Sequence, residues 1–248
     1  MAIPHGRNAT ALIGSVSLIR LSNNSRPRVL LAILVCLASV WVASVARGGA
    51  DFDRLLASIT QRWGAAAGPK FNGWRALVVG AGSAQDTERL KRANDFFNRQ
   101  IQFGEDAIIW NQPDYWATPM ETLGRGAGDC EDFAIAKYYT LKEMGVAAEK
   151  LRLIYVRAKT GASDAAPTQA HMVLAYYNQP DAEPLVLDNL VAEIRPASRR
   201  PDLVPVFSFN SEGVFTGTSP KDGSPSAGVG RLSRWEELLK RARLEGFE

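Results

Sequence analysis

The sequence predicts an α+β fold in which a group of helices precedes an antiparallel sheet. Apolar residues recur at helical spacing in the first half of the chain body, and short runs rich in β-branched and aromatic residues fill the second half. Helical and strand patterns that are separated along the chain in this way are typical of α+β domains. The 248-residue chain is 46% hydrophobic and 22% charged, which is an ordinary globular balance.

The first half of the body contains three stretches that we expect to be regular helices and one of short irregular helices. Residues 51–63 and 86–103 each carry a stripe of apolar side chains, and a glycine-rich connector is expected between them. Residues 105–122 are rich in Trp, Tyr and Pro and predict short irregular helices. The third helix is expected over residues 130–144, with Gly145 suited to end it.

The second half predicts four strands, at residues 151–157, 170–178, 184–188 and 204–210. Because residues 178–183 read as a turn, the second and third of these strands are expected to form an antiparallel pair. A loop rich in Gly, Ser and Pro is expected at 216–230, and a basic amphipathic helix at 231–244.

Residues 1–46 are predicted to be an export signal or an N-terminal membrane anchor, and residues 47–248 a single domain. Residues 29–46 contain eighteen positions without a charge, and Arg26 and Arg28 precede them. A basic start, an apolar centre and an end with small residues such as Ser44 and Ala46 are typical of export signals. The apolar run is also close to the length that spans a membrane. In either case we expect the body of the protein to be exported.

Charge argues against a nucleic-acid partner. The formal net charge is +3, but four of the 29 basic residues lie in 1–46, where there is no acid. The remaining residues therefore carry 25 basic and 26 acidic side chains. A body without a basic excess is not expected to bind the phosphate backbone of a nucleic acid.

The body contains one cysteine, Cys130, and one histidine, His171, because Cys36 and His5 lie in the leader. An intramolecular disulfide in the mature protein and a zinc site built from several Cys and His ligands are excluded by this count. A lone thiol in an oxidising compartment is exposed to oxidation and mispairing. Its presence therefore favours a chemical function.

Cys130 follows a glycine-rich segment and begins the third predicted helix. The free N–H groups and the positive end of the helix dipole favour a thiolate there. The same N–H groups can stabilise the oxyanion that forms during acyl transfer. The alternative is a small buried residue that only packs the helix.

His171 and Asp188 are the candidate partners of this thiol. Alternation along the strand places His171, Val173 and Ala175 on one face. Asp188 ends the neighbouring strand, from which it could orient the imidazole through its second nitrogen. The alternatives are a histidine that only satisfies its hydrogen bonds at a strand end and an aspartate that only caps a turn.

Three acids surround the candidate nucleophile. Asp129, Glu131 and Asp132 should raise the pKa of the Cys130 thiol and oppose its activation. Either they point outward, where they favour the start of a helix, or a cation neutralises them. Calcium is the cation that clustered carboxylate oxygens suit.

Three segments together resemble the bacterial transglutaminase-like cysteine proteinases, and within them the LapG-type periplasmic proteases. They are GDCEDFAIAKYYTLKEMGV, AHMVLAYY and PLVLDN, and the similarity extends over about residues 70–215. The resemblance implies a papain/transglutaminase-like fold with the nucleophile helix packed on the sheet. It also implies that Cys130 is the nucleophile, His171 the general base and Asp188 the orienting acid.

The resemblance further implies a calcium requirement, with Asp129, Glu131 and Asp132 in the acidic stretch linked to calcium. It implies a periplasmic endopeptidase that releases a large surface adhesin by a cut near its N-terminus and so promotes biofilm dispersal. The implied partner is the periplasmic domain of an inner-membrane receptor for cyclic-di-GMP.

The sequence leaves two alternative functions open. A transglutaminase-type acyltransferase would use the same three residues, with an amine in place of water. A non-catalytic binding module would instead use the Trp-rich segment, where Trp110, Tyr115 and Trp116 could form a docking surface.

Overall fold

The computed structural model describes residues 51–161, 166–215 and 229–247. All of these described residues belong to one compact unit. The predicted leader at 1–46 and most of the predicted loop at 216–230 lie outside the described residues, so both stay predictions. In the described part of the chain, no helix combines the length and the apolar character that crossing a bilayer requires.

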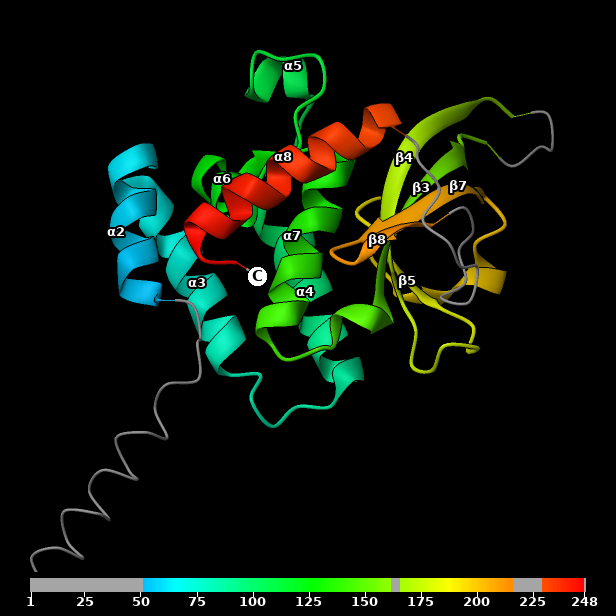
Figure 1. The fold of residues 1–248 in the computed structure, drawn as a ribbon, viewed down its shortest axis with the longest axis horizontal. Coiled ribbons are helices and arrows are strands. Elements are labelled where there is room, and N and C mark those ends of the chain that lie inside the picture. The colour runs from blue at the N-terminus through cyan, green and yellow to red at the C-terminus, as the bar shows by residue number, and fades with distance from the viewer. Residues whose placement is uncertain (1–50, 162–165, 216–228, 248) are drawn as a thin grey trace, which may run out of the picture. The chain divides into compact units, whose positions relative to one another are not determined.

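The helices surround one central member, α7 (Figure 1). In chain order they are α2 (Phe52–Trp63), α3 (Gly68–Val79), α4 (Asp86–Gln100), α5 (Asp106–Ile109), α6 (Pro119–Arg125), α7 (Cys130–Glu143) and α8 (Val229–Glu245). Short 3-10 turns lie at Ala65–Ala67, Ala148–Lys150 and Ala197–Arg199.

The main sheet is antiparallel, with the strand order β6-β5-β4-β3-β7-β8. Its strands are β3 (Leu151–Lys159), β4 (Thr168–Tyr176), β5 (Leu185–Leu187), β6 (Arg195–Pro196), β7 (Leu203–Asn210) and β8 (Gly213–Phe215). A separate two-residue parallel pair joins β1 (Gln102–Phe103) to β2 (Ala127–Gly128), just before α7.

The α+β class and the antiparallel pairing of β4 with β5 are therefore confirmed. The prediction of a mere connector after the first helix was wrong, because α3 occupies residues 68–79. Gly68, Pro69 and Gly73 weaken its helical signal in the sequence. The helix is held by burial of Phe71 and Trp74, whose rings lie 5.5 Å apart.

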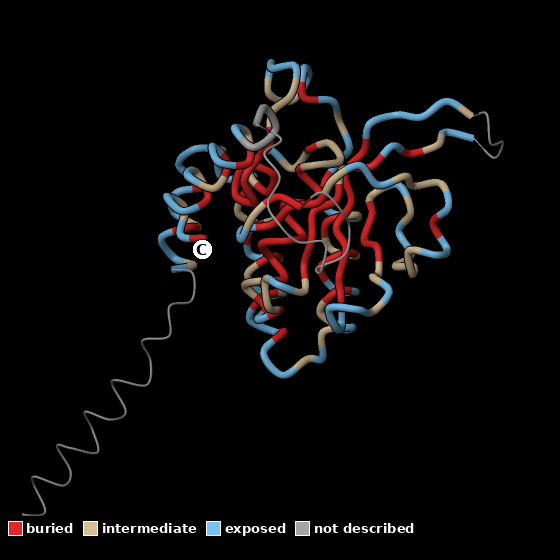
Figure 2. Tube along the Cα trace, turned by 45° about the vertical axis from the view of Figure 1, so that its right-hand side comes forward, coloured by how far each residue is buried: buried red, intermediate tan, exposed pale blue. Residues whose placement is uncertain are grey.

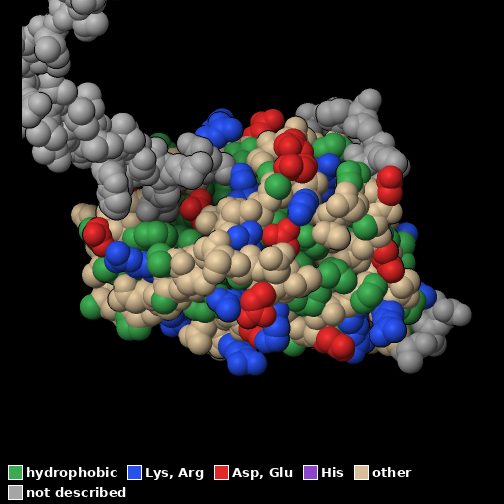
Figure 3. All heavy atoms as spheres, turned by 90° about the horizontal axis from the view of Figure 1, so that it is seen from below, with side chains coloured by type: hydrophobic (Ala, Val, Ile, Leu, Met, Phe, Trp, Pro, Cys, Tyr) green, Lys and Arg blue, Asp and Glu red, His purple; other side chains and the backbone are tan. Residues whose placement is uncertain are grey.

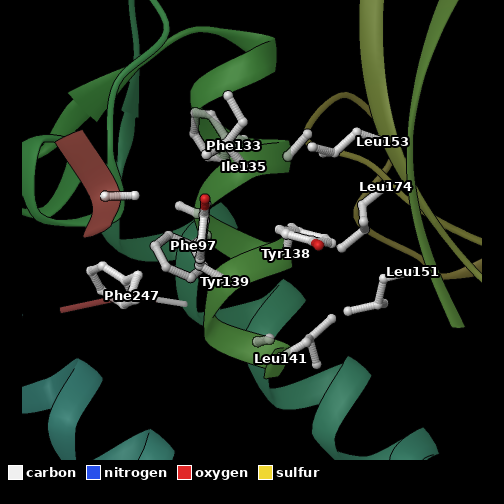
Figure 4. Packing of buried hydrophobic residues seen from close by; sticks show 14 of the residues in the cluster. Phe97, Phe133, Ile135, Tyr138, Tyr139, Leu141, Leu151, Leu153, Leu174 and Phe247 are labelled. Carbon is white, nitrogen blue, oxygen red and sulfur yellow. The ribbon is translucent and has the colours of Figure 1, made fainter. Parts of the chain in front are cut away.

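Helix α7 forms the centre of the hydrophobic core, and Figure 2 shows the buried backbone concentrated there. In Figure 4, Tyr138 is directed from α7 toward the sheet, where Leu153 and Leu174 lie, whereas Tyr139 lies close to Phe97 of α4. Because α7 is buried on several sides, its N-terminus is held rigidly with respect to the sheet. That rigidity matters because the helix begins at the candidate nucleophile.

The two faces of β4 differ as alternation predicts. Met172, Leu174 and Tyr176 belong to the core that contains α7. Val173 and Ala175 belong to a smaller cluster on the opposite face of the sheet. His171 has the parity of the second group, so β4 turns its imidazole to the face away from the core of α7.

In Figure 3, acidic and basic side chains are interspersed over the described part of the face shown. No single sign of charge dominates the described part of that face. This view agrees with the near-neutral balance of the chain body.

Candidate active site

Cys130 is the first residue of α7, and Asp129 occupies the N-cap position. The glycines before it have a steric role, which is clearest at Gly128. A Cβ atom at Gly128 would lie 2.6 Å from the Cβ of Asp132, a distance that real Cβ atoms do not adopt. The chain can therefore pass this closely beside the first turn of α7 only with glycine at position 128.

Hydrogen bonding explains how Cys130 approaches β4. Directly after β4, the N–H of Tyr177 donates to the carbonyl of Lys150 at 2.8 Å, so odd-numbered residues in this register bond to β3. The backbone N–H and C=O groups of even-numbered residues are directed to the other side of the strand, where Leu174 pairs with β5. Met172 lies beyond the end of that pairing, and its backbone N–H is directed to the Cys130 sulfur.

The thiol therefore lies beside the open edge of β4, next to the residue that carries the imidazole. Cys130 and His171 line the same cavity, which has a volume of about 320 Å³. A nucleophile from one face of the sheet can meet a base from the other face here, because in the described part of the chain β5 pairs only with residues 174–176 of β4. Apolar side chains of Phe103 and Leu190, both about half exposed, lie at the rim.

His171 and Asp188 form a direct contact. The Nε2 atom of His171 lies 2.8 Å from Oδ1 of Asp188, and both residues are buried. Continuing the β4–β5 register by one residue places Asp188 opposite Val173, on the same face as His171. The sheet register thus brings the predicted base and the predicted acid together, and it leaves Nδ1 of the imidazole available for the thiol.

Further donors hold the carboxylate of Asp188. The Leu190 N–H donates to Oδ1 at 3.0 Å, and Arg200 Nη2 donates to Oδ2 at 2.8 Å. Burial by itself would raise the pKa of Asp188, but the hydrogen bond and charge of His171, together with these two donors, lower it to about 2. Asp188 is therefore a stable anion at neutral pH.

The surroundings of Cys130 disfavour its ionised form. Burial raises the pKa of the thiol, and the negative charge of Glu131 raises it further. The sulfur donates a hydrogen bond to Oε2 of Glu131 at 2.9 Å, and Asp129 adds a smaller effect of the same sign. The N–H of Met172 acts to lower the pKa but does not outweigh them. In this arrangement the thiol remains protonated, as the acidic flanks predict.

The predicted metal residues belong to a larger acidic cluster. The ligand atoms of Asp106, Asp129 and Asp132 lie within 4.8 Å of one another, and so do those of Asp106, Asp114 and Glu131. Asp106 and Asp114 come from the Trp-rich segment before α6, where nothing in the sequence distinguishes them from helix-start or turn acids. The approach of that segment to α7 is what brings them in.

Unsatisfied oxygens within this cluster indicate that a cation fits there. One buried carboxylate oxygen of Asp106, of Asp114 and of Asp129 has no hydrogen-bond partner among the described residues. Buried oxygens of this kind are costly unless something positive meets them. Carboxylate oxygens in this number suit calcium rather than a thiol-seeking metal. Asp132 is more fully engaged, since it accepts from the Ala117 N–H at 2.7 Å and from the indole of Trp110.

The acids of this cluster resist ionisation in the absence of a cation. Burial and the neighbouring carboxylates raise the pKa of Asp129 to about 10 and that of Asp106 to about 6. Burial is also the main cause that raises the pKa of Asp132 well above its ordinary value, and the N–H of Ala117 opposes it. Each of these groups would gain from a nearby positive charge.

The Trp-rich segment packs within the fold. Trp116 is buried and stacks on Phe209 of β7, with ring centroids 5.5 Å apart. The indole of Trp110 donates to Asp132 and lies 4.8 Å from the ring of Tyr115. Trp110 therefore supports the acidic cluster and Trp116 packs the core, which gives both side chains a structural role independent of any docking partner.

The fold and the site residues define a class, the transglutaminase-like thiol enzymes. The family model described as bacterial transglutaminase-like cysteine proteinase matches residues 78–201, which is half of the chain. The chain belongs to this family of cysteine proteinases. No curated protein sequence matches it.

Solved structures of Legionella pneumophila LapG share the fold. One is 35% identical, with a TM-score of 0.65, and the match covers 79% of this chain and 99% of that one. An EGTA-treated form is 36% identical, with the same TM-score and coverage. A calcium-bound form is 38% identical, with a TM-score of 0.63, over 75% of this chain and 96% of that one. The papain/transglutaminase-like fold implied by the sequence resemblance is thereby confirmed.

Proposed function

We propose that this protein is a calcium-dependent cysteine endopeptidase that uses Cys130, His171 and Asp188 as its catalytic residues. The observation that carries the proposal is that a helix-start cysteine and a histidine line one cavity, and that this histidine contacts a buried aspartate. Membership of a cysteine proteinase family supports the same activity.

The chemistry follows from the placement of these groups. His171 takes the thiol proton at Nδ1 while Asp188 holds its Nε2, and the Cys130 sulfur attacks the carbonyl carbon of a peptide bond. The backbone N–H at the start of α7 donates to the oxyanion. His171 then gives its proton to the leaving amine, which departs with the C-terminal fragment. Water, deprotonated by His171, hydrolyses the thioester and restores the thiol.

Calcium would be held by the carboxylates of Asp106, Asp114, Asp129 and Glu131, with Asp132 as a further candidate. When bound, it supplies positive charge that offsets the acids beside the thiol. Glu131 is the residue through which this charge matters most, since its carboxylate accepts the hydrogen bond that the Cys130 thiol donates. A Glu131 side chain engaged elsewhere leaves the thiol free to bond His171.

The substrate, partner and location are proposed from the family resemblance alone. We propose that the substrate is a large surface adhesin cut near its N-terminus, and that its release promotes biofilm dispersal. The proposed partner is the periplasmic domain of an inner-membrane receptor for cyclic-di-GMP. Export through the leader at 1–46, with cleavage or retention as an anchor, would place the enzyme in the periplasm.

The test is cleavage of candidate surface proteins by the wild type and by Cys130→Ala, in calcium and in a strong chelator, with N-terminal analysis of the fragments. We expect cleavage only by the wild type in calcium, with the fold of the variant unchanged by circular dichroism. Cleavage by Cys130→Ala would end the assignment of the nucleophile, and undiminished cleavage in chelator would remove calcium from the account.

A labelled primary amine in the same reaction separates hydrolysis from acyl transfer. Both reactions pass through the thioester on Cys130, and they differ only in whether water or an amine attacks it. Incorporation of the amine without a cut product would identify a transglutaminase-type acyltransferase and contradict the proposal.

A further inference from the structure

Lys137 is a lysine inside the hydrophobic core. It lies on α7, seven residues after Cys130, and is only 1% exposed. Seven residues correspond to about two helical turns, so Lys137 and Cys130 lie on the same side of the helix. Its ammonium lies 5.8 Å from the centre of the Phe133 ring.

The amine is directed at the backbone of the proposed catalytic acid. Nζ of Lys137 donates to the carbonyl oxygen of Asp188 at 3.1 Å. Asn98 of α4 donates to the same oxygen at 2.8 Å. Asp188 follows the last residue of β5, and its backbone has no strand partner among the described residues, so these two side chains tie that carbonyl to the helices.

Burial of the Lys137 ammonium costs free energy. Within the described residues the ammonium forms no ion pair, and burial lowers the pKa of Lys137 to about 7, although the charge of Asp188 acts in the other direction. An apolar side chain of similar length would fill the same space without a desolvation cost. Stability of the core therefore does not account for a lysine at this position.

We propose that Lys137 is a positioning residue for the proposed reaction. By holding the Asp188 carbonyl against α7, it sets the His171–Asp188 pair at the separation from Cys130 that proton transfer requires. The Lys137 side chain extends from the helix that carries Cys130 to the backbone of Asp188, so it connects the nucleophile to the His171–Asp188 pair. This inference rests on the proposed function, because it assumes that the three residues act together.

The test compares the wild type with Lys137→Met in calcium. Both are made in the full chain with Cys36→Ser and His5→Gln, which leaves Cys130 and His171 as the sole thiol and imidazole. The readouts are the rate of Cys130 alkylation by iodoacetamide at pH 7, the NMR signal of the His171 Nε2 proton and the thermal midpoint. A small misplacement of catalytic groups is costly, so we expect alkylation to slow by on the order of ten-fold or more.

We also expect the His171 proton signal of Lys137→Met to shift, with a thermal midpoint equal to or above that of the wild type. The matched control is Thr140→Val, since Thr140 is a buried polar residue of α7 that bonds to Trp74 instead. It should lower the thermal midpoint and leave both the alkylation rate and the His171 signal unchanged.

An unchanged alkylation rate and an unchanged His171 signal in Lys137→Met would overturn the inference. If that variant does not fold, Asn98→Ala removes the other donor to the same carbonyl and should move both readouts in the same direction. A separate result would contradict the proposed function: alkylation of Cys130 in His171→Ala that is as fast as in its parent with the same background substitutions.

Discussion

At the scale of single residues, the surroundings of Asp188 favour its charged form, whereas the surroundings of Cys130 favour the neutral thiol. Donors surround the carboxylate of Asp188, and its pKa is lowered to about 2. Acids surround the thiol of Cys130, and its pKa is raised by burial and by Glu131. A cation bound at the acidic cluster would lower the pKa of the Cys130 thiol without disturbing the donors that surround Asp188, and it is the simplest physical means of doing so.

Some of these residue-level features could be predicted from the sequence and others could not. The Cys130, His171 and Asp188 positions followed from the singular Cys and His of the body and from strand alternation. Asp106 did not, because an acid at the first turn of a short helix has an ordinary local explanation. Only the tertiary approach of that segment to α7 gives it a role.

Gly128→Ala tests the close approach beside the acidic cluster. The added methyl group must displace Asp132, whose carboxylate accepts from the Ala117 N–H. We expect calcium affinity to fall by about 10–100-fold, the effect usual for disturbed support of metal ligands. Isothermal titration calorimetry measures it.

The matched control is Gly68→Ala, where a Cβ atom meets nothing within 4 Å. That variant should bind calcium as the wild type does. Equal calcium affinity in Gly128→Ala and Gly68→Ala would show that the approach at Gly128 does not support the site.

At the scale of elements, helices with a clear end signal were the most predictable. Gly145, in the left-handed region with φ of 86°, follows α7 as expected, and the Val146 N–H donates to the Leu141 carbonyl. Helix α3 has no such signal, since its stability comes from aromatic packing that only the folded chain provides. The separation of the sheet faces at β4 was predictable because a period of two leaves no alternative.

Helix α6 offers a test of a local start signal. Thr118 and Glu121 form a reciprocal capping box at its N-terminus, and both are buried. Thr118→Ala removes one half of the box, and we expect the free energy of unfolding to fall by about 1 kcal/mol. Urea denaturation measures this change.

The comparison variant is Thr87→Ala, which alters an exposed threonine near the start of α4. Among the described residues no side-chain hydrogen bond caps this helix. It should have little effect on unfolding. Equal stability of both variants would mean that the capping box does not contribute to the fold.

At the scale of the whole molecule, the site is assembled from segments that are distant in sequence. The acids before α6, the start of α7, the middle of the sheet and the end of β5 meet only because α7 packs on β4 and β4 pairs with β5. The sequence could indicate each segment and the order of the elements. It could not give the hydrogen bond between Cys130 and Glu131, which depends on side-chain geometry at the junction.

The pH dependence of stability is a property of the whole molecule that reports on the acidic cluster. The pKa values of Asp106 and Asp129 are raised in the folded protein to about 6 and about 10, above the ordinary value of 3.8. At these two groups the folded state therefore holds more protons than the unfolded state at neutral pH, and their contribution to stability falls as pH rises from about 4 upward. Calcium replaces those protons, so its benefit should increase with pH.

We therefore expect the difference in thermal midpoint between calcium and chelator to be larger at pH 7.5 than at pH 5. Glu245 and Lys137 also titrate in this protein, but they contribute to both conditions and largely cancel in the difference. Differential scanning fluorimetry at the two pH values provides the measurement. A calcium effect that is the same at both would argue against binding by these acids.

The most direct test that Cys130, His171 and Asp188 act as one site is the rate at which iodoacetamide alkylates Cys130 in calcium, measured as a function of pH in a Cys36→Ser background. If His171, steadied by Asp188, takes the thiol proton, the wild type reacts rapidly below pH 7. His171→Ala reacts slowly until the pH is above the ordinary pKa of a thiol, because burial of Cys130 still raises its pKa. Identical pH profiles for the two proteins would contradict the account.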